Sequence, residues 1–200
     1  MEAFRPLRGG GASARFAPQE ATLLRSLVGQ VSALLSGGEM DAAAEPGGSA
    51  ASGPPAPEAP DPRELDALAG FGGTEAPAGA PEDPALARLL PDAYTDDPEA
   101  AGEFRKYTEQ GLRSAKQDSA RTVLATLPAD GGRVKLSGDQ AEAWLRALND
   151  VRLTLGVRLD VTEEFEEQWA KLDPGDPRSA VFEIYAWLGS VQESLVEALM

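Results

Sequence analysis

SGDQAEAWLRALNDVRLTLGVRL, residues 137–159, is the stretch that decides the fold. Ser137 is followed three residues later by Gln140, a capping-box pattern in which each side chain satisfies a backbone N–H that the first helical turn leaves without a partner. Apolar residues then recur at spacings of three and four, the period of one helical face: Ala141, Trp144, Leu145, Leu148, Val151 and Leu155. Gly156 is expected to end the helix, because glycine readily adopts the left-handed conformation found at helix ends. The stretch therefore predicts an amphipathic helix at the centre of a helical core.

Helix signals recur in the rest of the chain. Pro18, Pro84, Pro98 and Pro177 each open an apolar or amphipathic run, and proline suits the first helical position, where a missing N–H costs nothing. These starts predict helices over 18–35, 84–90, 98–127 and 177–199. A shorter helix, capped by Thr162, is expected to carry Phe165 and Trp169. No internal repeat is apparent.

One face of the predicted 98–127 helix carries mostly small residues. At ~100° per residue, these side chains share it: Ala101, Phe104, Thr108, Leu112, Ala115, Ser119 and Thr122. We expect a neighbouring helix to approach this face closely. Basic residues flank it: Arg105, Lys106, Arg113, Lys116 and Arg121.

Strand signals are confined to short segments. Residues 4–16 alternate around Gly9-Gly10-Gly11 and predict a β-hairpin, because glycines permit the positive φ angles of a tight turn. Residues 133–136 also alternate, and a third short strand there could extend the hairpin. The predicted fold class is mainly α: a compact bundle of about five helices with a small N-terminal β-hairpin.

Residues 38–82 differ in composition from the rest. They are rich in Ala, Pro, Gly, Ser and acidic residues, and they hold few of the aromatic and branched side chains that offset the entropy of ordering a chain. We predict a disordered acidic linker here, inserted into a single helical domain that spans 1–200. Within it, 61–71 could form one amphipathic helical turn.

Composition excludes several classes of function. The 200 residues contain no His and no Cys, which excludes thiol nucleophiles, Ser-His-Asp triads and metal sites built on imidazole or thiolate ligands. The formal net charge is −15, which repels phosphate and argues against nucleic acid as a partner. No apolar run approaches the ~20 residues of a membrane span, and no secretory signal follows Met1. The expected location is the cytoplasm.

Two groups of polar residues are candidates for binding a ligand or a partner. Arg105, Arg113 and Lys116 belong to the basic flank of the 98–127 helix and could contact phosphate or an acidic protein. Asn149 and Arg152, three residues apart, can share a face of the central helix. For each group we favour a structural role over ligand binding, in which the charges form ion pairs within the fold. Glu109, for example, is within pairing distance of both Arg105 and Arg113 along the helix.

No catalytic or cofactor constellation stands out. The acidic run Glu163, Glu164, Glu166, Glu167 could in principle bind Mg²⁺ or Ca²⁺. Consecutive helical positions point in different directions, so a solvated acidic face is the favoured interpretation. The sequence also lacks a phosphate-binding Gly-rich loop. We predict no catalytic residues, no metal and no cofactor.

Four motifs appear in a fixed order: RLLPDAY at 88–94, EFRKYTE at 103–109, WLRALNDVRL at 144–153 and YAWLG at 185–189. In these motifs the chain resembles an actinobacterial family of domains of unknown function, whose members are typically encoded beside the ClpS protease adaptor. The resemblance covers nearly everything outside the linker, and Lys106-Tyr107 stands where relatives tend to have Arg-Phe. It implies a cytoplasmic bacterial protein linked to regulated proteolysis, with no established activity.

The sequence thus favours a non-catalytic helical module that interacts with another protein or regulates it. A DNA-binding regulator that uses the hairpin and the basic flank is one alternative. An enzyme that binds a small molecule or a phosphate ester is another, although the lack of His makes acid–base chemistry at neutral pH harder.

Overall fold

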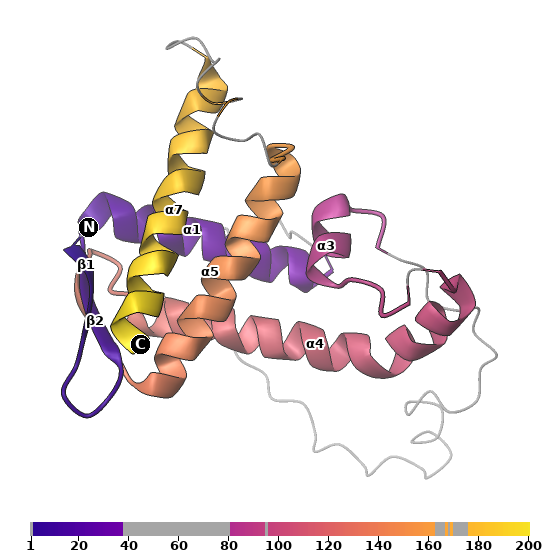
Figure 1. The fold of residues 1–200 in the computed structure, drawn as a ribbon, viewed down its shortest axis with the longest axis horizontal. Helices are drawn as coiled ribbons and strands as arrows, with labels where there is room; N and C mark the ends of the chain where they lie inside the picture. Colours follow the sequence, from indigo (N-terminus) through magenta and orange to yellow (C-terminus); the bar gives the residue numbers. More distant parts are fainter. Residues whose placement is uncertain (1, 38–80, 95, 163–166, 168, 170–175) are drawn as a thin grey trace, which may run out of the picture.

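Five α-helices and a three-stranded antiparallel sheet make up the part of the chain that the computed structural model describes (Figure 1). Described are residues 2–37, 81–94, 96–162, 167, 169 and 176–200. The predicted linker at 38–82 lies outside this part except for its last two residues. So does most of the short helix predicted after Thr162.

The sheet has the strand order β1-β2-β3. β1 (Glu2–Pro6) and β2 (Ala12–Phe16) form the predicted hairpin, and β3 (Gly132–Leu136) pairs antiparallel with β2. A Cβ at Gly11, where φ is 86°, would collide with the carbonyl oxygen of Leu136. Only glycine, which has no Cβ, therefore allows the end of the hairpin to lie this close to β3. The hairpin and the third strand are confirmed.

The helices pack around α5 (Gly138–Arg158), the predicted central helix. It contacts α4 (Pro98–Thr126), α3 (Pro84–Leu89), α7 (Pro177–Leu199) and α1 (Pro18–Leu35). α7 also covers β1, and α4 lies along α1 (Figure 1). The predicted helical bundle is confirmed, and α5 contacts each of the four other helices bounded above.

Trp144 of α5 is the largest fully buried side chain and lies between α5 and the sheet. Its ring lies 5.8 Å from the rings of both Phe4 in β1 and Phe16 in β2. Its indole N–H donates to the Thr126 hydroxyl at 2.8 Å, so the one polar atom of this large ring is satisfied. The aromatic cluster fixes the sheet onto the helices.

The predicted end of α5 is wrong by about one turn. The helix passes through Gly156 to Arg158, and the left-handed residue is Asp160, with φ 51°. Gly156 faces the ring of Tyr185 on α7. Contact with a neighbouring helix favours continued helix here, and this outweighs the weak preference of glycine for a helix end.

The prediction of which face of α4 is buried is also wrong for the first half of the helix. Phe104 and Leu112 are 45% and 39% exposed, whereas Arg105 is buried. The first half of α4 extends past α5 and packs mainly on the segment after α3 (Figure 1). Because α4 is polar on most sides, its sequence pattern could not identify the covered side.

Within the described residues, no helix combines the length and the apolar character needed to cross a bilayer.

Candidate functional site

The five residues singled out in the sequence lie in two places. Arg105, Arg113 and Lys116 line the side of α4 that faces the rest of the molecule, and Asn149 and Arg152 border a cleft beside α5. The structure therefore does not bring all five into one site.

Arg105 fastens the segment after α3 to α4. Its guanidinium forms an ion pair with Asp92 and another with Glu109, one turn along the helix, at 2.9 Å. A third, longer hydrogen bond runs to the carbonyl oxygen of Leu90 at 3.4 Å. The side chain is only 6% exposed, so its charge is used inside the fold.

Arg113 similarly links α4 to the end of α1. It donates to Glu109 through Nε at 2.8 Å, and its Nη1 donates to the carbonyl oxygen of Leu35 at 2.7 Å. That carbonyl belongs to the last turn of α1, where backbone acceptors lack helical partners. Burial alone would raise the pKa of Glu109, but hydrogen bonds from Arg105 and Arg113, and their charges, lower it. Glu109 is thus the shared anion of this network.

Lys116 joins α4 to the central helix. Its ammonium lies 2.6 Å from the carboxylate of Asp150, whose side chain is 4% exposed. Burial raises the pKa of Asp150 even though Lys116 opposes the shift. The pairing of Arg105 and Arg113 with Glu109 was predicted. The other anions are Asp92, in the segment after α3, and Asp150, on α5.

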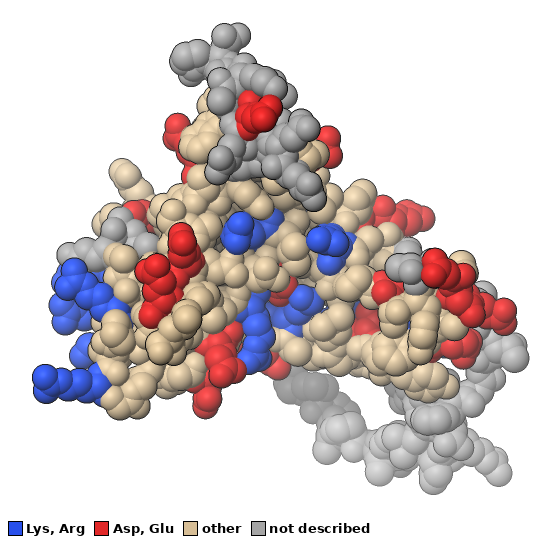
Figure 2. Space-filling view, in the orientation of Figure 1, with Lys and Arg blue, Asp and Glu red and all other residues tan. Residues whose placement is uncertain are grey.

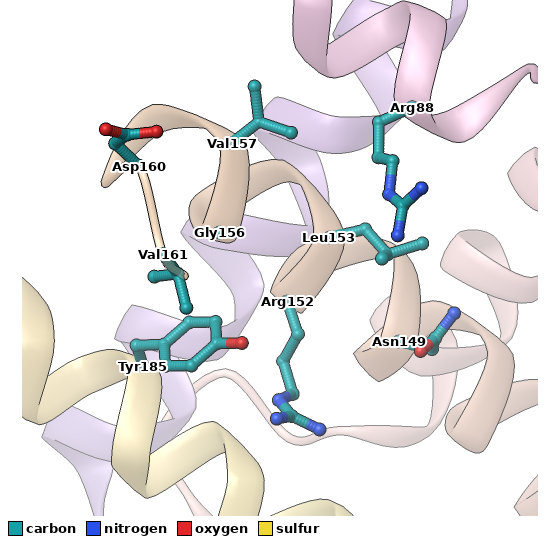
Figure 3. A pocket seen from close by; sticks show the side chains of 9 residues that line it. All are labelled: Arg88, Asn149, Arg152, Leu153, Gly156, Val157, Asp160, Val161 and Tyr185. Atoms are coloured by element: carbon teal, nitrogen blue, oxygen red, sulfur yellow. The ribbon is translucent and has the colours of Figure 1, made fainter. Parts of the chain in front are cut away.

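A cleft of about 510 Å³ runs along α5, between α3 and α7 (Figure 3). Arg88 reaches into it from α3, and Tyr185 borders it from α7. The side that α5 contributes comes from residues three and four apart, which share a helical face: Asn149, Arg152, Leu153, Gly156 and Val157. Its size falls within the range of small-molecule sites.

The charge balance of the cleft is unusual for this acidic chain. Arg152 donates to the amide oxygen of Gln192 at 2.9 Å and lies over the Tyr185 ring, with Cζ 5.2 Å from the centroid. Its Nε is buried and has no partner. We expected Arg152 to pair with a carboxylate, but its partners are an amide and an aromatic ring. Within the described residues neither Arg152 nor Arg88 has an ion pair, and the only carboxylate lining the cleft is Asp160.

These side chains can hold an anion. Two guanidinium groups and one amide bind carboxylate or phosphate oxygens. Neither imidazole nor thiol exists in this chain, and the described residues contain no group of acidic side chains arranged to hold a metal ion. The geometry supports binding.

Two surface features escaped the sequence analysis. One is the aromatic patch, which we define as Tyr94, Phe104, Tyr107 and Leu112 around the first half of α4; all four are exposed. Their spacing on α4 was visible, but we expected Phe104 and Leu112 to be covered. The other is a row of basic residues on the sheet, which the alternation of residues 13–15 and 133–135 could have shown.

The chain belongs to a family described as a domain of unknown function (DUF2017), which matches residues 1–199. This confirms membership of a family without an assigned activity. The genomic neighbourhood that the resemblance implied is not part of this finding.

Mycobacterial proteins are similar to the chain over most of its length. One from Mycobacterium leprae is 35% identical over 197 residues, which cover 92% of this chain and 80% of the relative. Those of Mycobacterium bovis and Mycobacterium tuberculosis are 34% identical with the same coverage, and both are named oxidative stress regulator AosR. No solved structure matches the chain.

Proposed function

We propose that this chain is a non-catalytic regulatory module that acts by binding another protein. The observation that carries the proposal is the aromatic patch. Tyr107 is 84% exposed, and Tyr94 and Phe104 pack edge to face against each other at 6.1 Å on the surface. Exposed aromatic residues that lie together are typical of protein interfaces, where tyrosine often contributes much of the binding energy.

The geometry around the patch suits a partner helix or loop. A groove of about 290 Å³ lies beside Phe104 and Leu112, lined also by Pro91 and Ala101. On the same helix, open space surrounds the position of a Cβ at Gly111, so another backbone can approach α4 closely there. The ion pair between the buried Arg105 and the exposed Asp92 holds the far side of the groove in place.

The names of the relatives agree with a regulatory role. If this chain shares their function, a thiol of its own cannot sense the oxidant, because it has no Cys. The signal would then reach the module through its partner. A cytoplasmic location and a link to regulated proteolysis remain predictions that rest on the resemblance.

Site-specific cross-linking tests the proposal. A photo-reactive phenylalanine at position 107 should cross-link a protein in lysate of the source organism, and the same group at Val196, 40% exposed on α7, should not capture that protein. Affinity capture with Tyr107→Ala should lose the partner, whereas Val196→Ala should retain it. Failure of the intact chain to capture any protein would refute the proposed function.

The cleft supports a second candidate function, the binding of a small anion. Two arginines without carboxylate partners face a cavity in a chain of net charge −15. Titration calorimetry with inorganic phosphate should show binding that Arg88→Gln weakens. Arg146→Gln, which removes an exposed cation paired with Glu142, should leave it unchanged. No heat up to about 10 mM phosphate, where even millimolar affinity would be visible, would argue against this function.

A further inference from the structure

The three-stranded sheet has one buried face and one basic face. Phe4, Ala14, Phe16, Val134 and Leu136 point inward and are buried. Because side chains alternate along a strand, the residues between them point outward, and most of these are cations. We define the basic face as Arg5, Arg8, Arg15, Arg133 and Lys135, all exposed.

The strand register brings these cations together. Arg15 of β2 lies directly opposite Arg133 of β3 on one side and opposite Glu2 of β1 on the other. Ser13 lies opposite both Arg5 and Lys135. Arg8 extends the basic face onto the hairpin turn. Like charges directly opposite each other destabilise a sheet. The Arg15–Arg133 pair therefore does not serve the stability of the sheet.

The three cations on the covered side of α4 differ from those of the basic face. On α4, Arg105, Arg113 and Lys116 each have a carboxylate partner within 3 Å. Within the described residues, none of the five cations on the basic face has an ion pair. Lys and Arg side chains gather at the hairpin end of the molecule, whereas acidic side chains cover much of the opposite end (Figure 2).

We propose that the basic face of the sheet binds an acidic, extended segment of a partner protein. This inference rests on the proposed function in one respect, namely that the occupant is a protein. Carboxylates of the segment would pair with the guanidinium groups of Arg15 and Arg133, whose planar donors match carboxylate oxygens. A hollow beside Arg15, lined by Ala17, Pro18, Gly131, Gly132 and the acidic Asp130, gives the segment room next to the strands.

The size and chemistry of the basic face favour a peptide over nucleic acid. Three strands of five residues cover roughly 10 Å by 17 Å, the length of about five extended residues. Both phenylalanines of the sheet point inward, so no aromatic ring is offered for base stacking. A duplex would extend beyond the basic face and meet the acidic surface of a chain with net charge −15.

Fluorescence anisotropy with defined probes tests this inference on the full chain. The probes are a labelled peptide of about ten residues in which Glu alternates with Ser, its Gln-for-Glu counterpart, and a labelled 20-base-pair duplex. We expect binding of the acidic peptide alone, weakening as salt rises from about 50 to 150 mM. The double variant Arg15→Glu, Arg133→Glu should weaken binding about tenfold or more. It replaces two attractive contacts with the carboxylates of the peptide by two repulsive ones.

The matched control is Arg121→Glu, Arg146→Glu, which makes the same charge change at two exposed helical sites, 67% and 63% exposed. It should change the affinity less than about twofold, because screening limits distant charges. If both double variants weaken binding equally, only net charge matters and the inference is wrong. The milder Arg15→Gln, Lys135→Gln variant replaces the charge reversal if circular dichroism shows that the reversal impairs folding. It should weaken binding in the same direction but less, because it removes attraction without adding repulsion.

Other outcomes would also overturn the inference. Tighter binding of the duplex than of the peptide, lost in the Arg15, Arg133 variant, would make the basic face a nucleic-acid site. Self-association of the intact chain that this variant abolishes would make it an interface between copies. Absence of peptide binding while cross-linking at position 107 still captures a protein would refute this inference and leave the proposed function intact.

Discussion

β2 with α1 and β3 with α5 are two strand–helix units built on the same plan. In each, a five-residue strand is followed by one capping residue, Ala17 or Ser137, and then by a helix. The strands pair antiparallel, with Ala14 opposite Val134. Position by position the units read ASARFAPQEATLLRSLV and GRVKLSGDQAEAWLRAL. The comparison shows which features local sequence determines and which depend on the place of a unit in the fold.

The shared features are local. Glu20 and Gln140 hold the same position and accept the backbone N–H of the capping residue, at 2.7 and 3.0 Å. A buried alanine follows each of them, and the buried positions then recur at three and four. Such signals act over a few residues, and the sequence predicted both helices nearly to their ends.

The differences arise from position. α1 contacts α4 and α5, whereas α5 contacts α1, α3, α4 and α7. At matched positions α1 has Leu24 and exposed Gln30, where α5 has Trp144 and buried Asp150. The unit of β3 and α5 therefore has a larger, aromatic side chain in the core, Trp144, and also a buried charged side chain, Asp150.

The largest effect is expected at the first of these matched pairs. Trp144→Ala should destabilise the fold by roughly 3–5 kcal/mol and Leu24→Ala by roughly 2–4 kcal/mol. Loss of the contacts with Phe4 and Phe16 makes the tryptophan the more costly deletion. Urea denaturation of both variants measures the difference.

Tryptophan fluorescence provides an independent check. A variant that keeps Trp144 but replaces Trp169 and Trp187 with Phe should emit at short wavelength, as a buried indole does. An emission like that of tryptophan in water, or an equal loss of stability in the two alanine variants, would contradict a central role for Trp144.

The second matched pair tests the buried charge. Lys116→Met removes the only cation that binds Asp150 among the described residues. The change should cost about 3 kcal/mol, because an unpaired buried charge remains. Gln30→Ala, at the corresponding position of α1, should change the free energy of unfolding by less than about 0.5 kcal/mol. Similar effects from both changes would show that the two units do not differ in this way.

The pH dependence of stability sharpens the same contrast. Burial raises the pKa of Asp150 above its ordinary value of 3.8, so the folded state binds this proton more tightly than the unfolded state does. The free energy of unfolding of the wild type, measured relative to that of Asp150→Asn, should therefore fall as the pH rises from about 3.8 through the raised pKa of the folded state. Above that pKa the difference between the two proteins should stay constant. Urea denaturation of both proteins from pH 3 to 7 measures the trend; a difference that grows in favour of the wild type would reverse the sign.

The same distinction, between local signals and the position of an element in the fold, explains how much of this structure the sequence predicts. Caps, proline starts and apolar spacing predicted the helices and the hairpin, because these signals are local. The exposed side of α4 was missed because its polar sequence suits several orientations, and only the neighbours of Phe104 and Leu112 decide which face is covered. Arg152 was correctly placed as a polar residue near the core, but its pairing with Gln192 depends on where α7 lies.

The candidate sites were predictable to a similar degree. The pairing of Arg105 and Arg113 with Glu109 follows from helical spacing, whereas Asp92 and Asp150 come from other elements. The basic face needs both the alternation of each strand and the register between strands. The first is present in the sequence, but the second arises only when β2 and β3 pair.

The smallest expected effect concerns the caps of the two helices. Ser137 accepts the N–H of Gln140 at 3.3 Å, whereas Ala17 has no side-chain oxygen and leaves the corresponding donor of α1 without that partner. Ser137→Ala should therefore destabilise by about 1 kcal/mol, and Ala17→Ser should stabilise by about 0.5–1 kcal/mol. Ala17 is exposed, so the added hydroxyl displaces nothing from the core. The pair can be measured by thermal unfolding of both single variants and the double variant, whose effects should add because each cap serves its own helix. If Ala17→Ser fails to stabilise while Ser137→Ala destabilises, the bond from Ala17 N–H to Glu20 already suffices to start α1, and the two units begin their helices in different ways.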